Sequence, residues 1–145
     1  LVFATFIGGN NLDYGFGIDV DGSSNVYVGG YTNSVDFPTV SPIHPTNSGG
    51  FDITVSKLNA AGNALVYSTY YGSTGQDQAW GLSVNNAGEA YLTGSTTSTF
   101  SFSTTGTHQI GFGGGTYDAF VLKLNAAGSA VAYCTYFGGT GEDLG

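Results

Sequence analysis

The stretch Leu1-Val-Phe-Ala-Thr-Phe-Ile-Gly-Gly9 occurs three times in this chain with small changes. It returns 64 residues later as Leu65-Val-Tyr-Ser-Thr-Tyr-Tyr-Gly-Ser73, and a further 66 residues on as Val131-Ala-Tyr-Cys-Thr-Tyr-Phe-Gly-Gly139. A period of this length is typical of repeat architectures, in which each unit buries its apolar faces against a neighbour. We therefore predict one unit at residues 1–64, a second at residues 65–130 and the start of a third at residues 131–145.

Each unit contains four strand-like segments separated by Gly, Asn, Asp and Ser turns. In the first unit they are Leu1–Ile7, Gly17–Val20, Val26–Gly29 and Ile53–Leu58, and in the second Leu65–Tyr71, Gly81–Val84, Ala90–Thr93 and Ala119–Leu124. Both alternating faces of Leu65–Tyr71 are apolar or aromatic, which indicates a sheet covered on both sides. The sequence predicts an all-β fold with two four-stranded antiparallel blade-like repeats plus the first strand of a third, arranged like a propeller or as an open stack.

The order of the motifs resembles a known repeat family. The motifs are Asp13–Asp21, Asn25–Thr32, Asp36–Thr39, Asp118–Ser129 and Tyr133–Gly139. Together they resemble the bacterial and archaeal SBBP repeat, which is named as a β-propeller repeat. The resemblance implies a secreted or cell-surface protein with many repeats, and it brings no catalytic residues with it. Two units and a fraction are too few to close a ring, so we expect an excerpt of a longer chain, an oligomer or an open stack.

The charge of the chain excludes several kinds of partner. The net charge is −8, with ten carboxylates, two lysines and no arginine. Binding to nucleic acid needs cations that displace counterions from phosphate, so we expect no nucleic-acid partner. No apolar stretch approaches the length of a membrane span.

The sequence lacks recognisable catalytic motifs, and we predict that the protein is not an enzyme. There is no Gly-x-Ser-x-Gly elbow and no Cys/His cluster with metal-site spacing. Asp19 and Asp21 are candidate calcium ligands because Ca²⁺ prefers carboxylate oxygens. The second unit has Ser83 and Asn85 in their places, which favours a hairpin turn and leaves calcium as the alternative. We expect no other cofactor.

Lys57 and Lys123 are the only cations of the chain and occupy the same repeat position. Each lies in a strand with apolar neighbours, where an unpaired charge is costly. We predict that they form structural ion pairs with the recurring aspartates: Asp13 or Asp77 for Lys57, and Asp77 or Asp143 for Lys123.

The two ends of the chain carry versions of the same strand, which predicts head-to-tail assembly with copies of itself or with adjacent repeats of a longer chain. The expected contact is strand addition at the segments 1–7 and 131–137. The residues expected to take part are Leu1, Phe3, Thr5, Ile7, Val131, Tyr133, Thr135 and Phe137. The predicted function is a non-enzymatic extracellular or cell-surface structural repeat of a filament, stalk or surface layer. The alternative is a fragment of a propeller adhesin that binds a glycan or a protein.

Overall fold

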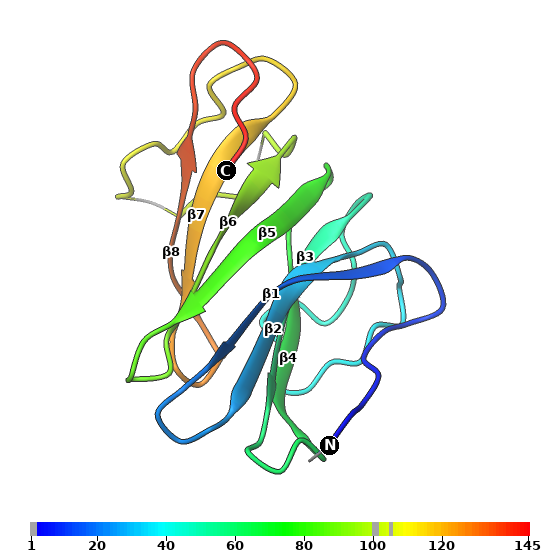
Figure 1. Ribbon diagram of the computed structural model, residues 1–145. Helices are drawn as coiled ribbons and strands as arrows, with labels where there is room; N and C mark the ends of the chain where they lie inside the picture. The colour runs from blue at the N-terminus through cyan, green and yellow to red at the C-terminus, as the bar shows by residue number, and fades with distance from the viewer. Residues whose placement is uncertain (1–2, 100–101, 105) are drawn as a thin grey trace.

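The protein consists of β-strands and loops throughout the part of the chain that its computed structural model describes, residues 3–99, 102–104 and 106–145 (Figure 1). Eight strands form two antiparallel sheets in which the strands follow sequence order. Sheet A contains β1 (Asp13–Val20), β2 (Val26–Thr32), β3 (Asp52–Leu58) and β4 (Leu65–Tyr71). Sheet B contains β5 (Asp77–Val84), β6 (Ala90–Thr96), β7 (Asp118–Leu124) and β8 (Val131–Phe137). The predicted all-β fold with two four-stranded sheets is confirmed.

The boundary between the two sheets lies one strand later than the boundary between the repeats in the sequence. Val131–Phe137, expected as the first strand of a third unit, is β8 and pairs with β7 to complete sheet B. Leu65–Tyr71 likewise completes sheet A as β4. Of the expected strand Leu1–Ile7, Leu1 lies outside the described residues, and residues 3–7 form no strand because no described strand pairs with them.

Short polar turns determine which strands pair within a sheet. In the β1–β2 hairpin, Asp21 Oδ1 accepts hydrogen bonds from the backbone N–H groups of Ser23 and Asn25, both at 2.9 Å. At the other turn of the sheet, the N–H of Asn59 donates to the carbonyl of Ala64 at 2.9 Å and joins β3 to β4. A turn this short connects neighbouring antiparallel strands, which places β4 in sheet A and not in the next sheet.

A β-bulge bends the first strand of each sheet at the same repeat position, between Gly15 and Gly17 in β1 and between Ala79 and Gly81 in β5. Opposite the bulge in β1 stands Gly30, where a Cβ atom would collide with the carbonyl oxygen of Tyr14. The bulged backbone approaches its neighbour too closely for any side chain at this position.

The two long loops lie along the outer edges of the sheets. The backbone N–H of Val40 donates to the carbonyl of Ser68 in β4 at 3.0 Å. In sheet B, the N–H of Thr104 donates to the carbonyl of Cys134 at 2.8 Å, and the N–H of Tyr136 donates to the carbonyl of Gln109 at 3.1 Å. The outer edges of β4 and β8 therefore already have hydrogen-bond partners.

Sheets A and B pack face to face, and their facing side chains form the main core (Figure 1). Sheet A contributes mainly aromatic and β-branched residues to this core, and sheet B contributes mainly aliphatic ones and phenylalanine. The fully buried members are Tyr27, Ile53, Val55 and Tyr67 from sheet A, and Ala90, Phe120, Leu122, Leu124 and Cys134 from sheet B. No helix in the described residues is long and apolar enough to cross a membrane.

Candidate functional site

The interface between the two sheets is formed by complementary small and large residues. A Cβ atom on Gly17 would stand 2.6 Å from Leu82 Cβ, and one on Gly29 would stand 2.8 Å from Leu82 Cδ1 and 3.2 Å from Leu92 Cδ2. Glycines in β1 and β2 therefore make room for leucines in β5 and β6. This contact fixes the distance between the sheets because neither glycine position can accept a side chain without moving the other sheet.

Three tyrosines of sheet A complete the interface. Tyr27 Oη donates to the carbonyl of Gly88 in the β5–β6 turn at 3.1 Å. The Tyr67 ring covers Gly128, where a Cβ atom would collide with it. The Tyr71 ring lies 5.6 Å from the ring of Phe102 and its hydroxyl donates to the Phe102 carbonyl. Each tyrosine packs its ring into the core, and Tyr27 and Tyr71 also place their hydroxyl groups on backbone acceptors.

The segment of residues 3–9 lies against sheet A in the way that β4 lies against sheet B. Phe3 is the repeat equivalent of Tyr67, and its ring covers Gly62 as Tyr67 covers Gly128. Gly9 N–H donates to Asp13 Oδ2 at 2.8 Å, and Ser73 N–H donates to Asp77 Oδ2 at 2.7 Å. Residues 3–9 thus occupy the place of the last strand of a sheet that would precede sheet A.

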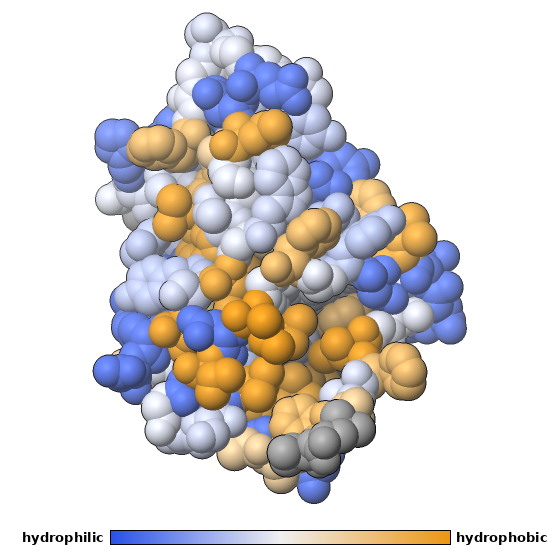
Figure 2. Space-filling view, in the orientation of Figure 1, coloured by the Kyte–Doolittle hydropathy of each residue, from blue (hydrophilic) through white to orange (hydrophobic). Residues whose placement is uncertain are grey.

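The rest of this side of sheet A, here called outer face A, is open and apolar. By register it carries Ile18, Val20, Val26 and Val28, the equivalents of Leu82, Val84, Ala90 and Leu92. Ile18 is 72% exposed, whereas Leu82 is half-buried beneath sheet A. Figure 2 shows apolar atoms gathered over the region of β1 and β2. Outer face A therefore repeats the surface of sheet B that sheet A covers.

The opposite side of sheet B, here called outer face B, repeats the surface that sheet A uses. Tyr91, Tyr133 and Phe137 are the equivalents of Tyr27, Tyr67 and Tyr71. Phe137 is 63% exposed, whereas Tyr71 is 6% exposed. Gly81, Tyr91, Thr93 and Val121 line a shallow hollow of about 340 Å³ on this face. This hollow is equivalent in position to the one that Gly17 and Gly29 of sheet A provide for Leu82 at the internal interface.

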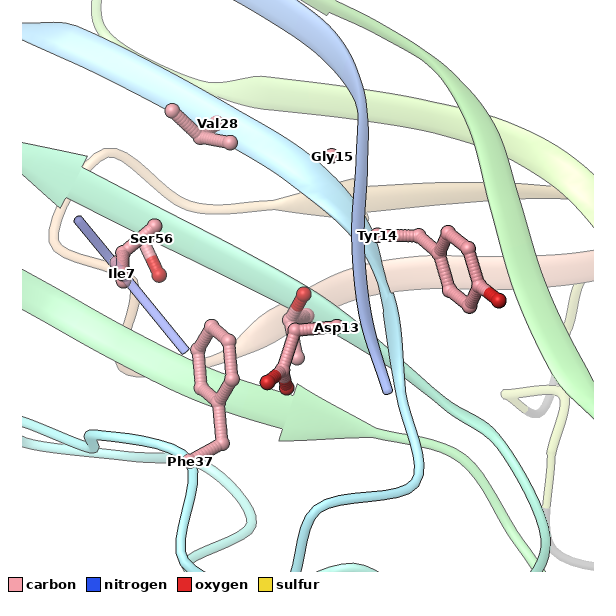
Figure 3. Close-up of a pocket in the computed structure, with 8 residues that line it drawn as sticks. Ile7, Asp13, Tyr14, Gly15, Val28, Phe37 and Ser56 are labelled. Carbon is pink, nitrogen blue, oxygen red and sulfur yellow. The ribbon is translucent and has the colours of Figure 1, made fainter. Parts of the chain in front are cut away.

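A second hollow lies between residues 3–9 and sheet A and is shown in Figure 3. In Figure 3, Asp13 lies in the middle of the lining residues, with Phe37 below it and with Ile7 beside Ser56. Its volume of about 40 Å³ is suited to a few water molecules, whereas pockets for small-molecule ligands usually measure roughly 300–1,000 Å³.

The predicted assembly residues are divided between these surfaces and the interior. Phe3, Thr5 and Ile7 lie on the side of outer face A, and Tyr133 and Phe137 lie on outer face B. Val131 packs against the core, and Thr135 is buried with its Oγ1 accepting the N–H of Gln109 at 2.9 Å. The loop at Thr104 and Gln109 already pairs with part of the edge of β8, so a strand added there would have to displace this loop.

Both lysines form ion pairs, but the predicted aspartates are the wrong partners. Lys57 Nζ lies 3.2 Å from Asp21 Oδ2, and Lys123 Nζ lies 2.9 Å from Glu89 Oε2. Register places Lys57 opposite Tyr27, beside the hairpin that contains Asp21. Asp13 lies at the other end of the strands, five residues or about 16 Å away. The expected partners Asp13, Asp77 and Asp143 instead accept the N–H of the fourth residue before them, Gly9, Ser73 and Gly139.

A signal for the true partners is present in the sequence. The first hairpin begins with the acid Asp21 and ends with the amide Asn25, and the second begins with the amide Asn85 and ends with the acid Glu89. The acid and the amide thus exchange places between the two hairpins, and each lysine pairs with the acid of its own sheet. Burial by itself would raise the pKa of Asp21, but hydrogen bonds from Asn25 and the Lys57 ammonium hold that pKa below its usual range.

The candidate calcium ligands Asp19 and Asp21 are both occupied as hydrogen-bond acceptors. Asp19 Oδ2 accepts the N–H of Val84 at 2.6 Å, which ties sheet A to sheet B and lowers the pKa of Asp19. Asp21 holds the hairpin and pairs with Lys57. Within residues 3–99, 102–104 and 106–145 there is no group of three or more acidic, histidine or cysteine side chains that could hold a metal ion. The geometry supports the hairpin-turn interpretation of this motif.

The family comparison agrees with the repeated geometry. Residues 3–38 match the model of the SBBP family, a beta-propeller repeat. The resemblance found in the sequence is confirmed for this segment, which spans residues 3–9, β1, β2 and the start of the following loop. The SBBP repeat is not typically catalytic. A search of curated proteins found no match to the chain.

Proposed function

We propose that this protein is a non-enzymatic structural repeat of an extracellular filament, stalk or surface layer, and that it assembles head to tail. The partner is another sheet of the same kind, from a second copy or from an adjacent repeat of a longer chain. One observation carries the proposal: both surfaces of the internal interface recur, in an exposed form, on outer faces A and B.

The proposed contact between units repeats the contact between sheets A and B. Ile18 of one unit enters the hollow beside Gly81 and Thr93 of the next, as Leu82 lies against Gly17 and Gly29. When a second copy docks, its Tyr133 replaces Phe3 over Gly62, so residues 3–9 have to leave this position. The two faces differ from each other, so the contact is heterologous and propagates into rings or open filaments.

The composition of the chain supports an extracellular location. The chain combines a net charge of −8 with only 8% charged residues and 25 glycines. Repeats that are rich in Tyr, Thr, Ser and Gly and poor in charge suit a building unit whose faces are covered by neighbours. The acidic surface keeps single units soluble before they associate.

Light scattering after size-exclusion chromatography tests the proposal. The chain should form larger particles as its concentration rises, and Ile18→Asp should keep it a folded monomer because a carboxylate cannot enter the hollow on outer face B. Val35→Asp is the matched control, since Val35 is 74% exposed in the loop after β2. A parent chain that stays monomeric at high concentration would contradict the proposal, as would equal loss of assembly in both variants.

A second candidate, a propeller adhesin that binds a glycan or a protein, is favoured by one cluster of rings. Tyr14, Phe16, Tyr31 and Phe51 lie with neighbouring ring centroids 5.0–6.2 Å apart, and Phe16 is 53% exposed. Partly exposed aromatic rings of this kind provide a rigid contact surface. Particles of one fixed size in the same light-scattering experiment would favour this candidate over an open filament.

A further inference from the structure

Two buried aspartates meet at the junction between sheet A and sheet B. Asp52 begins β3 and Asp77 begins β5, and both side chains are completely buried. A Cβ atom on Gly72, which follows β4, would stand 2.6 Å from Asp52 Oδ1 and 2.8 Å from Asp77 Oδ2. The two carboxylates therefore lie close to the same point, one from each sheet.

The two carboxylates differ in how well they are hydrogen-bonded. Asp77 accepts the N–H of Ser73 at 2.7 Å, the hydroxyl of Ser98 at 2.8 Å and the hydroxyl of Thr96. Asp52 Oδ2 accepts the N–H of Ser48 at 2.7 Å, but Asp52 Oδ1 has no hydrogen-bond partner among the described residues. A buried carboxylate oxygen without a donor is costly, and a proton on this atom lowers that cost.

The unpaired carboxylate oxygen beside a glycine recurs at the next repeat position. Asp118 is the equivalent of Asp52, and its Oδ1 also lacks a hydrogen-bond partner among the described residues. This atom stands 2.8 Å from the Cβ position of Gly138, which is the equivalent of Gly72. A feature built twice belongs to the design of the repeat and is not an accident of one loop.

The neighbours of the pair provide no positive charge. Tyr70 lies near Asp52, and Tyr71, Cys134 and Tyr136 lie near Asp77; burial raises the pKa of each of these four groups, so all are neutral at pH 7. Both lysines of the chain form ion pairs with the hairpin carboxylates Asp21 and Glu89. The backbone N–H groups of Ser48 and Ser73 that contact the pair donate to carboxylates and cannot coordinate a cation.

We propose that Asp52 and Asp77 hold one proton between them at the junction of the sheets, and that the fold is weakened when this proton leaves. With the proton on Asp52 Oδ1, that atom is a neutral hydroxyl group and no longer an unpaired negative oxygen beside Asp77. Without the proton, two negative charges face each other in a buried site. The inference concerns contacts within one chain and does not depend on assembly.

The direction of the pH dependence follows from the difference in proton binding between the folded and the unfolded chain. Burial, together with the negative charge of Asp77, raises the pKa of Asp52 to about 6, and burial raises the pKa of Asp77. The folded protein therefore binds a proton that the unfolded chain releases near pH 4. Stability is highest at the acidic side of this window and falls as the pH rises from about 4 to about 6.

Urea denaturation of the whole chain between pH 4.5 and pH 7 at constant ionic strength tests the proposal. The equilibrium constant for unfolding of the parent should rise roughly 20-fold across this range because of Asp52 alone. Asp52→Asn should remove most of this rise, because its amide stays neutral at every pH. Asp19→Asn is the control: the pKa of Asp19 is lowered, so this group acts at lower pH and the rise should persist.

A second measurement is independent of protein stability. The carboxyl carbon signal of Asp52 in an NMR titration should move with a midpoint near pH 6, and a midpoint at or below pH 4.5 would overturn the proposal. An equal rise in the parent and in Asp52→Asn would also overturn it. If millimolar Ca²⁺ at pH 7 stabilises the parent but not Asp52→Asn, the pair holds a cation in place of a proton and the proposal is wrong.

Discussion

Sheets A and B have the same strand order and the same bulge, yet corresponding faces of the two sheets differ in chemistry. In sheet B, Phe120 and Leu122 stand beneath sheet A and are completely buried. Their equivalents in sheet A are Thr54 and Ser56, which are buried on the side of the sheet where residues 3–9 lie. The interface between the two sheets is thus more apolar than the corresponding part of outer face A. If units assemble as proposed, the same backbone design provides a permanent contact inside the chain and a weaker, reversible contact between units.

The largest effect should come from equivalent truncations on the two faces. Leu92 is 2% exposed between the sheets, so Leu92→Ala should lower the free energy of unfolding by about 3 kcal/mol through lost burial and the cavity left behind. Val28→Ala, at the half-buried equivalent position on outer face A, should lower it by about 1 kcal/mol or less.

Urea denaturation at a concentration where the chain is monomeric measures both values. Ile18→Ala serves as a control on outer face A because its side chain is largely exposed in the single unit. Equal losses for Leu92→Ala and Val28→Ala would break the comparison, since they would show that outer face A is as fully packed as the interface.

A smaller effect should separate the two lysine ion pairs. The Lys57 and Asp21 side chains are 11% and 6% exposed, whereas those of Lys123 and Glu89 are 20% and 30% exposed. Lys57→Met keeps the apolar stem over the Tyr27 ring but removes the charge, and should lower the free energy of unfolding by about 1 kcal/mol at pH 7. Lys123→Met should lower it less, because water screens the more exposed pair.

The pH dependence of these variants provides the check. The pKa of Asp21 is held below its unfolded value, so its contribution is present above about pH 4 and is lost as the pH falls further. Lys57→Met should therefore lose less stability than the parent between pH 5 and pH 2.5 in thermal or urea melts. An unchanged acid profile would mean that Lys57 contributes nothing to the state of Asp21.

Much of the fold could be predicted from the sequence, because the alternation of apolar residues and the Asn/Gly turns act locally. The segments Val26–Gly29, Ile53–Leu58 and Leu65–Tyr71 are all strands in the structure. The strand at which each sheet begins could not be predicted in the same way. A cyclic pattern has no natural first strand, and the boundary depends on which turn joins strands of one sheet. The tight turn at Asn59–Ala64 was the local signal that β4 belongs with β3.

The candidate surfaces were harder to predict than the strands. The sequence located the end segments, but it suggested edge pairing because the loops that cover β4 and β8 have no strand-like pattern. The ion-pair partners were missed because charge positions were compared along the chain, while register decides which end of a sheet they occupy. The Asp52–Asp77 junction requires two sheets to meet, and such contacts between distant residues leave little local trace.

Mixing two blocked variants tests head-to-tail assembly most directly. Ile18→Asp blocks outer face A and leaves outer face B intact, whereas Phe137→Asp blocks outer face B and leaves outer face A intact. Each variant alone should be a monomer by light scattering, and an equimolar mixture should form a dimer and nothing larger, because one productive pair of faces remains. If the mixture stays monomeric, or if either variant alone still forms long particles, the faces described here do not join the units.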